Sequence, residues 1–295
     1  MAVGRITRAI AGFFYVEDLD APEEITECSV RGRLKLNAAS LLVGDIVEYS
    51  REGAKGIIAG ARQRSSVLKR PYIANVELLL LVFAHQRPDP NDVLIARFLV
   101  LAESSGIPYC LVFNKTDLVE EGNAHRLANK YLNYGYQVIC TSVPNRLGQE
   151  QIEEAIRGKI AVFAGPSGVG KSALLNLLVP EMQLKTGAVS EKIGRGRHTT
   201  REVQLLKVKK HTYIADTPGF SQINMDLVEP SQLAWYFPDF LPYRNACRFA
   251  SCLHDTEPDC GLKNAVSQGK ITLERYHSYL ELLAEIKQQW TQRYR

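Results

Sequence analysis

The sequence predicts an α/β fold in the central part of the chain, preceded by an all-β region and followed by a short region that contains cysteine and histidine. The central prediction rests on continuous apolar runs that alternate with helix-like stretches, as is typical of strands buried on both faces of a parallel sheet. The runs are residues 78–83, 109–113, 137–140, 160–164 and 212–215. We therefore expect three regions, at residues 1–70, 71–221 and 222–295.

The N-terminal region contains short β-prone segments separated by glycine, proline, asparagine and charged residues. These segments are residues 11–16, 25–30, 45–49 and 55–61. Their length and spacing predict a small β-barrel or a sandwich. The basic residues 62–71 would lead out of it into the central region.

Beyond residue 221 the strand signal ends, and a helix is expected at about residues 272–291. Its apolar side chains recur at steps of three and four residues, so one face must pack against another part of the chain. These side chains are Tyr276, Leu280, Leu283, Ile286 and Trp290.

Composition and charge favour a globular protein with one concentrated basic stretch. The chain has 295 residues, 45% of them hydrophobic, and a formal net charge of +4. Residues 185–210 hold eight lysines and arginines against two glutamates, so we expect this stretch to face an anion. The first twelve residues lack an apolar run long enough for a signal peptide or a membrane span, and we expect a cytosolic protein.

Residues 165–172, GPSGVGKS, fit the phosphate-loop pattern G-x-x-x-x-G-K-[ST] between an expected strand and an expected helix. Backbone N–H groups of such a loop surround phosphates, Lys171 reaches the β and γ phosphates, and the Ser172 hydroxyl ligates Mg²⁺. A glycine-rich turn without a ligand is the alternative, and the flanking elements disfavour it. The predicted nucleotide contacts are Gly165, Pro166, Ser167, Gly168, Val169, Gly170, Lys171, Ser172 and Ala173.

The four residues Asn114, Lys115, Thr116 and Asp117 follow the expected strand 109–113 and resemble the N-K-x-D motif of guanine-nucleotide-binding proteins. The Asp117 carboxylate can accept from the guanine N1–H and 2-amino groups, and adenine offers neither donor in that place. A site built for those donors leaves a buried charge unpaired when ATP binds. Lys115 would lie along the base plane, and Asn114 would connect neighbouring loops. The motif therefore predicts GTP rather than ATP.

A second, looser base-reading signal follows the expected strand 137–140. Residues 140–143, CTSV, are similar to an S-A-K-type loop, in which backbone near Ser142 would meet guanine O6. An ATPase remains the alternative reading if Asp117 does not read the base.

Two further segments resemble the switch regions of GTPases. Residues 216–219, DTPG, resemble the D-x-x-G motif, in which Asp216 holds Mg²⁺ through water and the Gly219 N–H meets the γ phosphate. Upstream, residues 196–200, GRHTT, occupy the expected place of a threonine that ligates Mg²⁺ only when the γ phosphate is present. Thr200 is the preferred candidate and Thr199 the alternative.

The residue that would orient the attacking water is not the glutamine found in Ras-like proteins. Ras-like proteins have a glutamine after D-x-x-G, and Phe220 at this position cannot hydrogen-bond to water, so intrinsic turnover should be slow. His198 is the candidate to orient the water once a partner fixes its loop, next to the catalytic Lys171 and Thr200. The alternative is that His198 only contacts the partner.

The order of these motifs is circularly permuted, because the guanine motif at Asn114 precedes the phosphate loop at Gly165. The D-x-x-G segment then comes last, and the C-terminal region is joined almost directly to it. The fold class predicted is thus an α/β, circularly permuted P-loop GTPase domain between two smaller domains.

A compact group of soft metal ligands follows. Cys247, Cys252, His254 and Cys260 offer three thiolates and one imidazole within fourteen residues, enough for a closed tetrahedral Zn²⁺ site. With all four positions filled by protein, the ion would be structural. Free core cysteines or a redox pair are the alternatives.

Taken together, GPSGVGKS, GRHTT, DTPGF, the permuted order and the Cys/His group resemble the RsgA family of small ribosomal subunit biogenesis GTPases over nearly the whole chain. The resemblance implies an N-terminal OB-fold barrel, a permuted GTPase domain and a C-terminal zinc-binding domain with a helix. It also implies late maturation of the small (30S) subunit, with hydrolysis stimulated by that subunit.

We therefore expect a cytosolic, monomeric GTP hydrolase that binds the 30S subunit and its rRNA in the GTP state and leaves after hydrolysis. Its cofactors would be Mg²⁺ with GTP and one structural Zn²⁺, and no membrane would be involved. The alternative is an RNA-binding assembly checkpoint, gated by GTP occupancy, in which hydrolysis is incidental.

Overall fold

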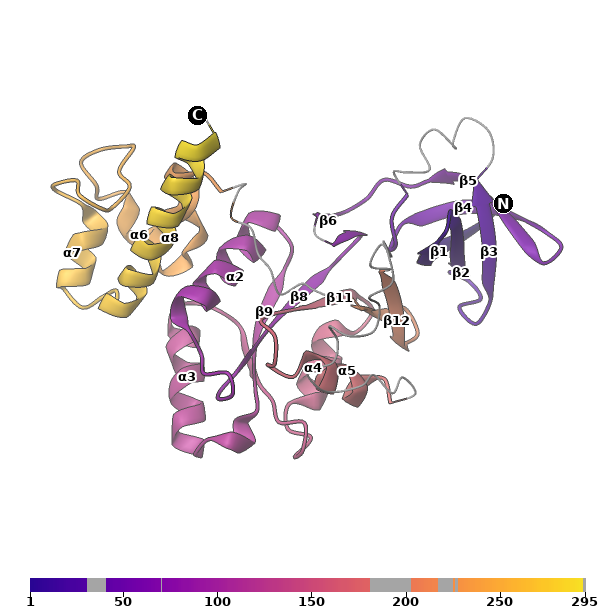
Figure 1. Ribbon diagram of the computed structural model, residues 1–295, viewed down its shortest axis with the longest axis horizontal. Helices are drawn as coiled ribbons and strands as arrows, with labels where there is room; N and C mark the ends of the chain where they lie inside the picture. The colour runs from indigo at the N-terminus through magenta and orange to yellow at the C-terminus, as the bar shows by residue number, and fades with distance from the viewer. Residues whose placement is uncertain (31–40, 70, 181–202, 217–224, 226–227, 294–295) are drawn as a thin grey trace.

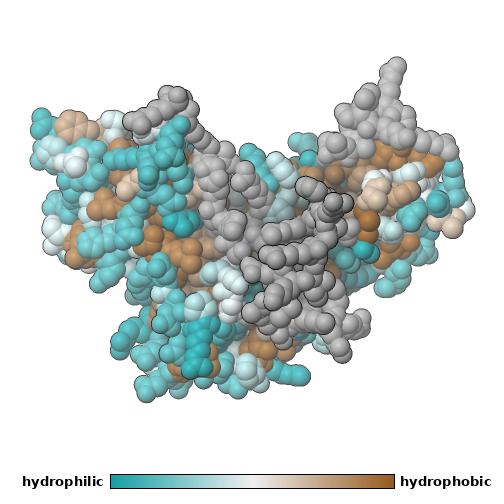
Figure 2. Space-filling view, viewed as in Figure 1, coloured by the Kyte–Doolittle hydropathy of each residue, from teal (hydrophilic) through white to brown (hydrophobic). Residues whose placement is uncertain are grey.

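A computed structural model of the chain describes residues 1–30, 41–69, 71–180, 203–216, 225 and 228–293. Its central α/β part lies between an N-terminal barrel and a C-terminal helical part (Figure 1). From the same side, the two outer parts stand apart on either side of the central one, with hydrophilic and hydrophobic residues mixed on their surfaces (Figure 2). No helix within the described ranges is both long and apolar enough to cross a membrane.

The N-terminal part is a closed five-stranded barrel rather than a sandwich. Strand β4 pairs with β1 and closes the order β1-β2-β3-β5-β4. The strands are β1 (Ala2–Ile10), β2 (Phe13–Asp18), β3 (Ile25–Val30), β4 (Ile46–Glu52) and β5 (Lys55–Ala61). Inward-facing Ile6, Val16 and Tyr49 are fully buried in its core. Strand β1 was not expected from the sequence, because Arg5 and Arg8 interrupt its apolar pattern.

The central sheet confirms the apolar runs as strands, and all of them except the half-buried edge strand at residues 138–140 consist mainly of buried residues. Its parallel strands are β10 (Val138–Cys140), β9 (Tyr109–Asn114), β8 (Leu78–Ala84), β11 (Ile160–Ala164) and β13 (Thr212–Asp216), in that spatial order. Strand β12 (Gln204–Lys209) runs antiparallel to β13. Its lysines belong to the basic stretch in which we expected no strand.

In the part of the chain that the structure describes, two helices cover each face of this sheet. Helices α2 (Asp92–Ser105) and α3 (Glu121–Asn133) lie on one face, and α4 (Gln149–Ile156) and α5 (Lys171–Leu178) on the other. Alternate residues of β8 separate the two cores, since Leu81 belongs to the α2 side and Leu80 to the α4 and α5 side. This period of two follows from the strand geometry.

The barrel and the central sheet share backbone hydrogen bonding. Strand β12 pairs with β13 on one side and with β1 on the other, so within the described residues one sheet of eleven strands runs through both parts. The connection between them includes a short hairpin of β6 (Val67–Lys69) and β7 (Tyr72–Ala74).

The C-terminal part packs on the outer side of helix α2. It consists of η3 (Pro230–Tyr236), η4 (Pro238–Phe240), α6 (Leu241–Arg244), α7 (Gly261–Ser267) and α8 (Leu273–Arg293). Helix α8 confirms the expected C-terminal helix, and its Tyr279 and Leu283 share a core with Ala96 and Val100 of α2. Because Phe98 and Leu99 of α2 face the sheet, this helix is buried from both sides.

A buried arginine joins the C-terminal part to the central part. Arg275 of α8 is 4% exposed, and its guanidinium donates to both Asp239 carboxylate oxygens at 2.9–3.3 Å and to the Tyr136 hydroxyl at 2.5 Å. It also lies over the rings of Phe237 (4.2 Å) and Tyr134 (4.9 Å). Tyr134 and Tyr136 come from the loop between α3 and β10, so this single side chain spans the contact between the two parts.

We expect Arg275→Ala to destabilise the chain by about 3–5 kcal/mol, because removal of one partner leaves the other buried and unpaired. Urea unfolding followed by circular dichroism measures this. Arg157→Ala, which breaks an exposed ion pair with Glu154, should change the stability by less than about 1 kcal/mol. An equal, small loss in both variants would contradict the proposed role of Arg275.

Candidate functional site

The predicted motifs that lie within the described residues meet at the carboxyl ends of the central parallel strands. The phosphate loop follows β11, Asn114 ends β9, Ser142 follows β10, and Asp216 ends β13. These strands are parallel, so their carboxyl ends lie together, which is where open α/β sheets bind ligands.

The phosphate loop depends on two glycines for close backbone approaches. Gly165 has φ +148°, and a Cβ there would lie 2.1 Å from the Val82 carbonyl oxygen. Gly170 has φ +97°, and a Cβ there would lie 2.3 Å from Asn114 Nδ2. Helix α5 begins directly afterwards at Lys171, as predicted. Of the other predicted contacts, Ser167, Gly168 and Ser172 are exposed, Pro166 and Ala173 are half-buried, and Val169 is buried.

Lys171 lies over the phosphate loop. Its Nζ donates to the carbonyl oxygens of Gly165 (2.7 Å) and Pro166 (2.6 Å). Burial lowers the pKa of Lys171 to about 8, because desolvation disfavours the ammonium. An anion at this position would favour the charged form and raise that pKa.

The guanine motif is tied directly to the phosphate loop. Asn114 is 2% exposed, and its Nδ2 donates to the Val169 carbonyl at 2.9 Å. Lys115 donates to the carbonyl oxygens of Gly168 (2.6 Å) and Arg87, and burial lowers its pKa. The guanine motif and the phosphate loop, whose bonded residues are 53 and 55 positions apart in the chain, thus form one loop cluster.

The second base-reading loop contacts the guanine motif through both side-chain and backbone hydrogen bonds. Ser142 donates through Oγ to Asp117 Oδ1 at 2.6 Å, and this hydrogen bond orients the carboxylate. Thr116 donates through N and Oγ1 to the Thr141 carbonyl, each at 3.1 Å. The Thr141 Oγ1 donates to Asn114 Oδ1 at 3.0 Å.

Two participants in this cluster were missed by the sequence analysis. Thr141 is fully buried, and its position next to Ser142 was the only signal that could have indicated it. Arg87 takes part through its backbone carbonyl, which carries no residue-specific signal. The structure otherwise brings Asn114, Asp117 and Ser142 together at the edge of the sheet.

Several predicted residues lie outside the described part of the chain. These are Gly196, Arg197, His198, Thr199, Thr200, Gly219 and Phe220. Asp216 is described only as the last residue of β13, where its backbone lies opposite Gln204. The proposed Mg²⁺ ligands Thr200 and Asp216 therefore stay predictions.

Only residues 203–210 of the expected anion-facing stretch are described, and two of its lysines form ion pairs within this chain. Lys207 Nζ lies 3.2 Å from Glu17 Oε1, and Lys209 Nζ donates to Glu153 Oε2 at 2.6 Å. Both charges are therefore matched by carboxylates of this chain, because β12 packs beside the barrel and helix α4.

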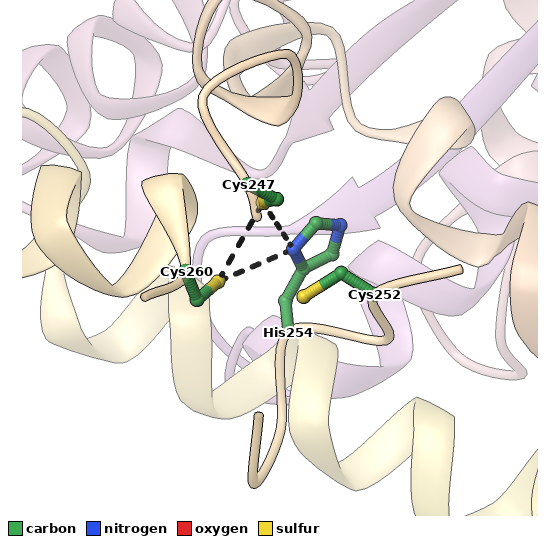
Figure 3. A group of neighbouring side chains, drawn as sticks. All are labelled: Cys247, Cys252, His254 and Cys260. Carbon is green, nitrogen blue, oxygen red and sulfur yellow. Dashed lines mark hydrogen bonds between the residues drawn. The ribbon is translucent and has the colours of Figure 1, made fainter. Parts of the chain in front are cut away.

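The Cys/His group converges as predicted. Cys247, Cys252, His254 and Cys260 place their ligand atoms within 4.8 Å of one another (Figure 3). The His254 Nδ1 lies 3.4 Å from both Cys247 Sγ and Cys260 Sγ, and those two sulfur atoms lie 3.9 Å apart. Tetrahedral zinc, with bonds of about 2.3 Å to sulfur and 2.0 Å to nitrogen, needs ligand separations of roughly 3.5–3.8 Å. The group is therefore compatible with a zinc ion.

Comparison with known proteins identifies the family. The sequence model described as "RsgA GTPase" matches residues 61–226, and that of the "RsgA N-terminal domain" matches residues 3–58. The chain belongs to the RsgA GTPase family. This membership agrees with the barrel, the permuted motif order and the Cys/His group, and it makes the chain a GTPase.

Similar members of the RsgA GTPase family match over nearly their full length. Proteins named small ribosomal subunit biogenesis GTPase RsgA are 44% identical in Alkaliphilus metalliredigens, over 97% of this chain and 98% of the relative, and 42% identical in Caldanaerobacter subterraneus, over 99% and 98%.

Two crystal structures also match. That of YjeQ from Thermotoga maritima has 34% identity and a TM-score of 0.83, covering 97% of this chain and 98% of the other. That of YloQ, described as a circularly permuted GTPase, has 35% identity and a TM-score of 0.79, covering 98% and 96%. The permuted α/β fold is thus shared with solved relatives.

We expect the affinity for GDP to fall about fourfold between pH 7 and pH 8.5, because the phosphate-binding ammonium of Lys171 is lost as the pH rises through its pKa. Titration with a fluorescent GDP analogue measures this. Lys171→Arg keeps its charge over this range and should bind more weakly with a flat profile. A flat profile in the unsubstituted protein would contradict the prediction.

Proposed function

We propose that this chain hydrolyses GTP during late maturation of the small (30S) ribosomal subunit, which it binds in the GTP state and leaves after hydrolysis. The observation that carries the proposal is the hydrogen bond from Asn114 Nδ2 to the Val169 carbonyl. It fixes a guanine-reading motif against a phosphate loop, so one site reads both ends of a guanine nucleotide. The small subunit enters the proposal from the name of the relatives, small ribosomal subunit biogenesis GTPase RsgA.

The base would lie between Lys115 and the loop at Ser142. Asp117 would accept from guanine N1–H and the 2-amino group, in an orientation held by the Ser142 hydroxyl. The Ser142 backbone would meet O6, which adenine lacks. A carboxylate fixed in this way discriminates strongly, because an incorrect base leaves it unpaired.

The phosphates would lie in the loop from Gly165 to Ser172, with Lys171 moving from its present carbonyl partners to the β and γ phosphates. Magnesium, when bound, neutralises phosphate charge. We propose Ser172, Asp216 and Thr200 as its protein-side contacts, with Thr199 the alternative to Thr200. Gly219 would donate its N–H to the γ phosphate.

Hydrolysis would depend on a partner. Phe220 follows the D-x-x-G motif in place of a glutamine and cannot orient water, so the isolated chain should turn over slowly. We propose that His198 orients the attacking water once the small subunit fixes its loop.

The Cys/His group would hold one structural zinc ion. Figure 3 shows its four side chains directed at a common point, and their donor set of three sulfurs and one nitrogen suits Zn²⁺. Zinc there would order the loop between α6 and α7, which has little apolar core of its own.

The remaining expectations follow from this role. A factor acting on ribosomal subunits is expected in the cytosol, bound to rRNA through its barrel and basic residues, and we propose that it acts as a monomer. The domain boundaries at residues 70 and 221 also stay proposals.

We expect purified 30S subunits to accelerate single-turnover GTP hydrolysis, and His198→Ala to lower the accelerated rate by roughly 100-fold at unchanged subunit affinity. Rapid-quench measurement of phosphate release, with binding measured by co-sedimentation, checks both. Unchanged hydrolysis in His198→Ala would leave this residue a contact only. If the subunits failed to accelerate hydrolysis, the RNA-binding checkpoint would be favoured instead.

The same assay contains a control for base recognition. Asp117→Asn should lose the binding and hydrolysis of GTP and should bind and hydrolyse xanthosine triphosphate instead. The 2-oxo group of xanthine can accept a hydrogen bond from the asparagine amide. Retained preference for GTP would show that Asp117 does not read the base.

We expect one zinc ion per chain, and Cys260→Ser to lose it and to lower the thermal midpoint of the C-terminal part. Elemental analysis and differential scanning calorimetry measure the two effects. The matched control is Cys28→Ala, which alters a buried barrel cysteine far from the group and should retain the zinc. If the unsubstituted protein contained no zinc, and Cys260→Ser had the same thermal midpoint as that protein, the zinc site would be rejected.

A further inference from the structure

The barrel reaches the edge of the nucleotide site through strand β12. In β1, Arg8 lies opposite Gln204 of β12, and Gln204 lies opposite Asp216 of β13. These three residues form one row across three neighbouring strands. The last residue of β13, at which the D-x-x-G motif begins, is therefore two strands away from the barrel.

Side chains reinforce this backbone pairing at a buried carboxylate. Glu17 of β2 is 3% exposed, and it accepts a hydrogen bond from the Tyr213 hydroxyl at 2.7 Å. Lys207 lies 3.2 Å from the same carboxylate oxygen and also donates to the Pro22 carbonyl at 2.7 Å. One barrel residue thus contacts both β12 and β13.

Tyr213 is itself enclosed by barrel residues. It is 1% exposed, and the Arg5 guanidinium carbon lies 5.4 Å from the centre of its ring. Burial and the neighbouring Glu17 carboxylate raise the pKa of Tyr213, so its hydroxyl stays protonated and donates at neutral pH. Loss of this donor would leave a buried carboxylate short of one partner.

We propose that Glu17 and Tyr213 are positioning residues. Through them, the packing of the barrel against β12 and β13, here called docking, favours the binding of GTP over the binding of GDP. Docking holds β12 and β13 in register up to Gln204 and Asp216. The γ phosphate and its Mg²⁺ would hold the same strand ends, because the proposed function places Asp216, opposite Gln204, at the magnesium ion. Two events that fix the same backbone lower each other's entropic cost.

This coupling rests on the proposed function, since it requires those residues to respond to the γ phosphate. Coupling between two binding events is reciprocal. If GTP strengthens docking more than GDP does, then weaker docking must weaken GTP binding more than GDP binding. The affinity ratio is a measure that a purely structural role of Tyr213 would leave unchanged.

The test compares Tyr213→Phe with Tyr15→Phe in the full-length chain. Both variants lose a tyrosine hydroxyl that contacts a barrel glutamate, but the contact of Tyr15 with Glu27, at 3.4 Å, lies within the barrel. Dissociation constants for a non-hydrolysable GTP analogue and for GDP are measured by fluorescence titration. We expect Tyr213→Phe to reduce the preference for the GTP analogue about 3–10-fold, and Tyr15→Phe to leave it unchanged.

Glu17→Gln is a milder second variant, because its amide oxygen can still accept from Tyr213 while its charge opposite Lys207 is lost. Its preference should lie between those of the unsubstituted protein and Tyr213→Phe. An unchanged ratio in Tyr213→Phe, or the same shift in Tyr15→Phe, would overturn the proposal. Failure of the unsubstituted protein to bind either guanine nucleotide would instead count against the proposed function.

Discussion

The burial of strand β8 on both faces is the constraint on which the arrangement of the site depends. All seven of its residues are buried, and it pairs in parallel with β9 on one side and β11 on the other. Its register places Ala84 opposite Asn114 and Leu81 opposite Ala164. The base-reading and phosphate-binding loops therefore follow the two strands that flank β8, whatever their order along the chain.

The sequence predicted the parts of the molecule whose physical requirements are strict. Strands buried on both faces must be apolar throughout, which located β8 and β11. Glycine is required at Gly165, where a Cβ would lie 2.1 Å from a backbone oxygen, and at Gly170, where φ is +97° and a Cβ would lie 2.3 Å from the Asn114 side chain. Strands β1 and β12 were missed because charged side chains such as Arg5 and Lys207 have partners in the other part of the chain. Those pairings depend on tertiary structure and leave no local pattern.

The connection between the outer parts and the nucleotide site differs on the two sides. The C-terminal part is attached to the body of the central part, through the outer side of α2 and through Arg275 beside Tyr136. The barrel instead contacts β12 and β13. Chain connectivity alone had predicted that the C-terminal part lies next to the switch at residues 216–219. The described contacts show that both outer parts border the nucleotide domain, at different elements.

The pairing of β1 with β12 also bears on solubility. A sheet that ends in an unpaired strand presents free N–H and C=O groups, to which other chains can add. At one side of the central sheet, β1 of the barrel pairs with β12 at Arg8 and Gln204, and at the other side the described sheet ends with β10, which has three residues. The barrel thus occupies the start of one such edge, so less of the β12 backbone is left open to pairing with another chain.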